Sequence, residues 1–139
     1  MFRNLFVTAA VVFPLILGGC VGSNDRVLSS EGQVQLRNIQ SKAYETGDKA
    51  LVMRAVLSTL QDLGFIIDKA DESIGSISAT QFTGGATVKM TVSVRVSGKQ
   101  TIVRANAQYG LSAIEDPKPY QNFFNSLGQS LFLAEHAVD

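Results

Sequence analysis

The residues with the widest chemical repertoire in this 139-residue chain are a single cysteine, Cys20, and a single histidine, His136. A zinc site needs about four Cys, His or carboxylate ligands. A serine triad needs a histidine base and an oxyanion site, and the chain has no Gly-x-Ser-x-Gly turn. His136 falls in the last turn of a predicted helix, where a cation complements the dipole. We therefore expect no enzyme, no catalytic residue, no metal ligand and no cofactor.

Two other short stretches have a chemical and a structural interpretation. Asp68, Asp71 and Glu72 surround a predicted turn and could bind Ca²⁺ loosely, but they lack the spacing of an EF-hand, which favours a solvated turn. Gly84 and Gly85 could form a phosphate cradle, but no Lys-Ser/Thr pair follows them. A loop between two strands is the better prediction.

Lys89, Arg95 and Arg104 form a candidate basic patch on one predicted hairpin, suited to lipid headgroups or an acidic partner. The alternative is ordinary surface charge. The chain holds twelve basic and twelve acidic residues, and it lacks the basic stripe that is typical of nucleic-acid binders. We expect no nucleic-acid partner.

The N-terminus predicts a signal peptide over residues 1–19. Arg3 supplies a positive charge, and an apolar run, LFVTAAVVFPLIL, extends from Leu5 to Leu17. A short basic region, an apolar stretch of about 7–15 residues and small residues before a cleavage site are the features of such leaders. The run is shorter than the roughly 20 residues that a membrane-spanning helix needs.

Leu17, Gly18, Gly19 and Cys20 resemble the lipobox of bacterial lipoproteins. The resemblance implies cleavage before Cys20 and acylation of its thiol, and two or more acyl chains give stable anchoring. Val21 stands where Asp is usual in inner-membrane lipoproteins, which favours the periplasmic side of the outer membrane. Because Cys20 has no second cysteine to pair with, the fold must be stable without a disulfide within the chain.

The mature chain is predicted to contain a flexible tether, residues 20–33, and one domain, residues 34–139. The tether is rich in Gly, Ser and Asn. In the domain, Thr46 or Asp48 suits a helix N-cap, Gly64 suits its C-cap, and Asp116-Pro117 suits the start of a second helix. The sequence predicts strands over 35–45, 65–68, 75–82, 87–96 and 100–108, and helices over 46–64 and 116–139.

The stretch TVKMTVSVRV, residues 87–96, alternates between apolar and polar residues and predicts a strand with one buried face. The order β-α-β-β-β-β-α predicts an α+β two-layer sandwich, an antiparallel sheet with two helices on one face. Gly128 is expected to allow close approach of the last helix to the sheet. Four aromatic residues of that helix are expected in the core, with an acyl-chain or partner-helix grip as the alternative: Tyr120, Phe123, Phe124 and Phe132.

The stretch from Arg54 to Phe82 resembles the helix-to-strand core of the domains of BamC, the lipoprotein subunit of the β-barrel assembly machine. Leu60, Gly64, Phe65, Asp71 and Gly75 occupy comparable places, which implies a similar fold. The partner contacts of BamC are not carried over. The DP-x-x-Y-x-x-FF pattern, residues 116–124, also resembles small uncharacterised proteobacterial lipoproteins.

These observations together predict a lipid-anchored, non-enzymatic protein-binding or assembly accessory module of the cell envelope. One alternative is a carrier of a small ligand or lipid between the helices and the sheet. Another is self-assembly into a homo-oligomer through an exposed strand edge.

Overall fold

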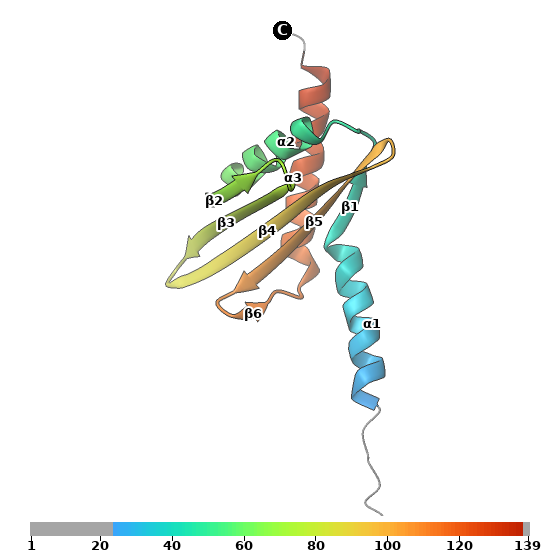
Figure 1. Cartoon of the computed structure of the whole chain (residues 1–139). Helices are drawn as coiled ribbons and strands as arrows, with labels where there is room; N and C mark the ends of the chain where they lie inside the picture. Colours follow the sequence, from blue (N-terminus) through green and yellow to red (C-terminus); the bar gives the residue numbers. More distant parts are fainter. Residues whose placement is uncertain (1–23, 138–139) are drawn as a thin grey trace, which may run out of the picture.

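A computed structural model describes residues 24–137 (Figure 1). The predicted signal peptide and the lipobox lie outside the described residues. The described elements, in chain order, are α1 (Asn24–Ile39), β1 (Ser41–Tyr44), α2 (Lys49–Asp62), β2 (Ile66–Asp71), β3 (Ser76–Thr83), β4 (Ala86–Ser97), β5 (Gln100–Tyr109), β6 (Ser112–Ala113) and α3 (Pro117–His136).

The described strands form one antiparallel six-stranded sheet in the order β1-β5-β4-β3-β2, with β6 paired to β5. In Figure 1, α2 and α3 lie behind this sheet. The predicted α+β two-layer class is therefore confirmed. The order differs from the prediction by an additional helix, α1, and an additional short strand, β6.

The β4–β5 hairpin supplies the centre of the core. Gly98 turns the chain with a φ of 62°, and the register Val94↔Val103 and Val92↔Ala105 places apolar side chains opposite each other. These side chains are buried against α2 and α3 because alternate residues of a strand face one side. The predicted alternation of residues 87–96 is confirmed.

The cap residues of α2 are confirmed. The Asp48 carboxylate accepts a hydrogen bond from the Leu51 backbone N–H at 2.9 Å. Gly64 follows the helix with a φ of 86°, the left-handed conformation that favours glycine. The helix is shorter than predicted and runs from Lys49 to Asp62.

The prediction for α3 is partly confirmed. The helix starts at Pro117 behind the N-cap Asp116, and Tyr120, Phe123 and Phe124 are buried. Phe132 is 60% exposed, so its core assignment is wrong, because it lies off the buried stripe of α3, which ends with Leu131. The close approach expected at Gly128 is also wrong, since a Cβ built there would have no neighbour within 4 Å.

The predictions for residues 20–45 need correction. The prediction of a flexible tether is wrong from Asn24 onward, because α1 begins there. The strand predicted over 35–45 is limited to Ser41–Tyr44, because α1 continues to Ile39. Gln, Leu and Arg near its end favour helix, and Arg37 in the last turn complements the dipole. In Figure 1, α1 extends away from the edge of the sheet beside β1.

No helix in the described part of the chain is both long and apolar enough to cross a membrane.

Candidate functional site

One face of the sheet carries no helix in the described part of the chain, and we call it the open face. It faces the viewer in Figure 1. Its side chains alternate along the strands with those of the core, and most carry a hydroxyl, an amide or a positive charge. The open face comprises Ser41, Ala43, Ile66, Lys69, Asp71, Ser76, Ser78, Thr80, Phe82, Thr87, Lys89, Thr91, Ser93, Arg95, Ser97, Gln100, Ile102, Arg104, Asn106 and Gln108.

The predicted basic patch is only partly assembled on this face. Arg104 pairs with Ser93 and Ile102 pairs with Arg95, so the two arginines are diagonal neighbours on β5 and β4. Lys89 pairs with Gln108, six residues along β4 from Arg95, which corresponds to about 20 Å in a strand. The patch therefore consists of Arg95 and Arg104 without Lys89.

A hollow of about 570 Å³ surrounds the two arginines, and we call it the basic hollow. It lies where β4 runs past the start of β3, beside the β2–β3 turn. Sequence reasoning missed Lys49 and Ile74, because neither lies near the hairpin in sequence. The lining comprises three cationic residues (Lys49, Arg95, Arg104), two serines (Ser41, Ser93) and four aliphatic residues (Ile74, Val94, Val96, Ile102). The side chains of Val94 and Val96 belong to the opposite face of β4, because they alternate with Arg95 along the strand.

The turn that carries Ile74 is fixed by Asp71. Its carboxylate accepts hydrogen bonds from the hydroxyl and the backbone N–H of Ser73, and from the N–H of Ile74 at 3.4 Å. The hydrogen bond from the Ser73 hydroxyl, and then that from Ile74, lower the pKa of Asp71. Lys49 Nζ donates to the Ser73 carbonyl at 3.2 Å. These bonds hold the turn against the start of α2.

Gly75 brings this turn close to β4. The Val94 N–H donates to the Gly75 carbonyl at 2.7 Å. A Cβ built on Gly75 would lie 2.1 Å from the Val94 carbonyl oxygen, and the φ of Gly75 is 69°. Only glycine allows this approach without displacement of backbone.

The acidic turn does not form a cation cage. The Asp68 carboxylate accepts a hydrogen bond from the Thr80 hydroxyl at 2.6 Å, while the Asp71 carboxylate accepts hydrogen bonds within the turn. Among residues 24–137, no group of three or more His, Cys, Asp or Glu side chains has a geometry suited to a metal ion. Gly84 and Gly85 form the β3–β4 turn, as predicted.

A second hollow lies between the helices and the sheet and has a volume of about 340 Å³. Its walls are mainly apolar, and its rim is polar. Gln81 is held in place because its Nε2 donates to the Leu63 carbonyl at 2.9 Å. We call this the helix–sheet groove, and it is lined by Leu63, Phe65, Gln81, Val88, Met90, Ala107, Ile114, Asp116, Lys118, Pro119 and Asn122.

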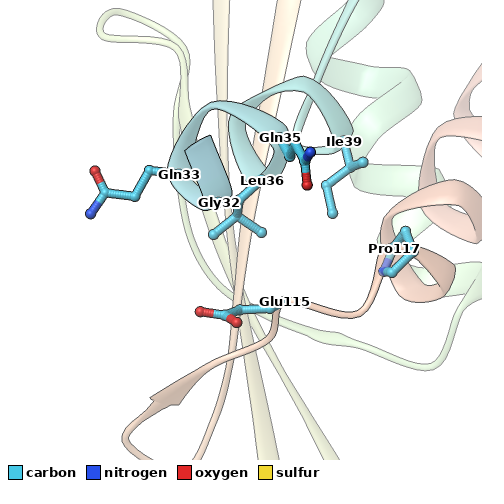
Figure 2. Close-up of a pocket in the computed structure, with 7 residues that line it drawn as sticks. All are labelled: Gly32, Gln33, Gln35, Leu36, Ile39, Glu115 and Pro117. Atoms are coloured by element: carbon cyan, nitrogen blue, oxygen red, sulfur yellow. The ribbon is translucent and has the colours of Figure 1, made fainter. Parts of the chain in front are cut away.

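A third hollow, of about 520 Å³, lies between α1 and the segment that leads into α3. Figure 2 shows Leu36 and Ile39 extending from α1 toward Glu115 and Pro117, whereas Gln33 points away. Leu36 and Ile39 are half-buried. Ile39 also packs against the hydrophobic core, so the C-terminal end of α1 contacts the domain.

His136 lies in the last turn of α3, as predicted. Its ring stacks on Phe132 with centroids 4.2 Å apart, and its Nδ1 lies 2.8 Å from the Phe132 carbonyl oxygen. Both contacts are within the helix end, where a cation is favourable.

Comparisons with known proteins give no function. No protein-family model matches the chain, and no curated protein is significantly similar to it. The chain is similar to a DUF4468 family protein from Bacteroides ovatus, known from a crystal structure, with 10% identity and a TM-score of 0.43. That match covers 71% of this chain and 86% of the other.

Proposed function

We propose that this chain is a lipid-anchored, non-enzymatic module of the bacterial cell envelope whose open face binds a protein partner. The observation that carries the proposal is the sheet face opposite α2 and α3, which is rich in hydroxyl, amide and cationic side chains and includes a hollow. Polar groups with well-defined positions give an interface its specificity. The anchoring part rests on the lipobox, residues 17–20.

Anchoring is tested by metabolic labelling with a fatty-acid analogue. We expect the native chain to be labelled and to fractionate with outer membranes, and Cys20→Ser to lose both properties. Ser23→Ala is the matched control, because it changes a nearby hydroxyl and leaves the thiol. Retained labelling of Cys20→Ser would contradict lipidation at this residue.

Partner binding is tested with a photo-crosslinking amino acid placed in the full chain in cells. Thr91 and Asn106 are paired positions on the open face, and Gln121 is an exposed control on α3. We expect one discrete adduct with an envelope protein from both open-face positions and none from Gln121. Absence of an adduct, or an adduct only with a second copy of this chain, would contradict the proposal, and the latter would establish self-assembly.

The helix–sheet groove supports a second candidate function, transport of a small apolar ligand. Its volume lies in the range of about 300–1,000 Å³ that is common for ligand pockets, and its walls include Met90 and Ile114. Native mass spectrometry of the full chain should then show an added mass that Val88→Phe removes and Val96→Phe retains. A protein without added mass would exclude this candidate.

A further inference from the structure

We propose that the basic hollow binds a short acidic segment of the partner protein in which carboxylates alternate with aliphatic side chains. This inference rests on the proposed function, because it identifies the chemistry by which the open face selects its partner. It is carried by the charges and the apolar walls of the hollow.

The charge of the hollow is entirely positive. Lys49, Arg95 and Arg104 line it, and no carboxylate belongs to the lining within the described chain. Arg95 and Arg104 are exposed and lie on neighbouring strands, so two planar guanidinium groups are available at one place. Such groups bind carboxylates through paired hydrogen bonds.

The apolar side chains favour a protein segment over a phosphate group. Ile74 is 70% exposed, and it lines the hollow together with half-buried Ile102. A phosphate or a lipid headgroup would contact the cations and leave these side chains in water. A segment that also carries aliphatic side chains would cover them.

Two carboxylates near the hollow limit the length of the acidic segment that can bind there. Asp71 accepts hydrogen bonds from Ser73 and Ile74. Glu45 accepts one from Nε2 of Gln100, two residues before Ile102 on β5. An acidic segment that extended past the arginines would meet these like charges. We therefore expect a short segment, with its carboxylates at Arg95 and Arg104.

The test is a binding titration of the full chain, purified in detergent, with the acetylated peptide Glu-Leu-Glu-Leu-Glu at low salt. We expect saturable binding, which Arg95→Glu combined with Arg104→Glu weakens by about tenfold or more. Lys89→Glu is the matched control, because it changes a cation on the same face outside the hollow, and we expect a change below about twofold. Equal losses in Lys89→Glu would overturn the proposal and indicate a response to net charge.

Two further measurements separate the alternatives. Ile74→Ser should weaken binding of the peptide by about threefold, as expected for loss of a partly exposed apolar contact. Because Ile74 is exposed, we expect the substitution to leave the fold intact. Saturable binding of glycerol 3-phosphate that equals that of the peptide would overturn the proposal in favour of an anion site.

The crosslinking experiment distinguishes failure of this inference from failure of the proposed function. If the crosslinker in place of Thr91 still gives its adduct when Arg95→Glu and Arg104→Glu are both present, the open face binds a partner without the hollow. Loss of the adduct in that variant, with retention in Lys89→Glu, would support both proposals.

Discussion

The hydroxyl of Tyr120 takes the place of a strand neighbour for Ala107. The Ala107 N–H donates to Tyr120 Oη at 3.1 Å, and Oη donates to the Ile114 carbonyl at 2.7 Å. On this edge of β5, β1 covers Thr101–Arg104 and β6 covers Gln108–Tyr109. Tyr120 therefore satisfies a backbone group in the gap between two short strands.

Tyr120→Phe should destabilise the fold by about 1–3 kcal/mol. The substitution leaves the Ala107 N–H and the Gln40 amide, which donates to the same hydroxyl at 3.2 Å, without this acceptor in a buried place. The free energy of unfolding in urea measures the change. Tyr109→Phe is the matched control, because Tyr109 is 54% exposed, and we expect it to change stability by less than about 0.5 kcal/mol. Equal effects would contradict a special role for the Tyr120 hydroxyl.

The parts of the fold that the sequence predicted are those with strong local signals. The alternation in β4, the Asp48 cap of α2 and the Asp116-Pro117 start of α3 each depend on a few neighbouring residues. The helix α1 was missed because Gly32 and two serines, Ser29 and Ser30, resemble a linker in composition. The strand β6 was missed because its two residues carry no periodicity.

The candidate site was only partly predictable for a different reason. The alternation of residues along each strand indicated that Lys89, Arg95 and Arg104 could share a face. Only the register between the strands shows which of them are neighbours. Lys49 and Ile74 reach the basic hollow through the close approach of Gly75 to β4. Phe132 was expected in the core as one of four aromatic residues of α3, but it lies off the buried stripe of this helix, which ends with Leu131.

A pair of threonines gives opposite predictions for removal of a hydroxyl. Thr59 is 1% exposed, and its hydroxyl has no hydrogen-bond partner in the described structure. Thr59→Val should stabilise the protein by about 0.5–1 kcal/mol, because a buried polar atom without a partner is costly. The equally buried Thr101 donates to the Thr46 carbonyl at 2.6 Å, so Thr101→Val should destabilise by about 1–2 kcal/mol. Urea unfolding of both variants tests the contrast, and the same sign for both would contradict it.

Gly75→Ala should cost more stability than the same change at another left-handed glycine. At Gly75 the methyl group would meet the Val94 carbonyl, whereas a Cβ on Gly84, with a φ of 51°, has no neighbour within 4 Å. We expect a loss of about 2–4 kcal/mol for Gly75→Ala and about 1–2 kcal/mol for Gly84→Ala from the backbone conformation alone. Thermal unfolding by circular dichroism compares the two, and similar losses would show that β4 yields to the methyl group.

The Asp71 turn should make a small part of the stability pH-dependent. Hydrogen bonds from Ser73 and Ile74 lower the pKa of Asp71 in the folded protein. A carboxyl group with a lowered folded pKa stabilises the fold above its unfolded pKa, near 3.8, and this contribution is lost as the pH falls through the folded pKa. Asp71→Asn should therefore be less stable than the native chain at pH 6, and the difference should shrink steadily as the pH approaches 2. Urea unfolding of both proteins across this range measures the difference. A difference that stays constant with pH would contradict the role of the charge and assign the effect to the shape of the turn.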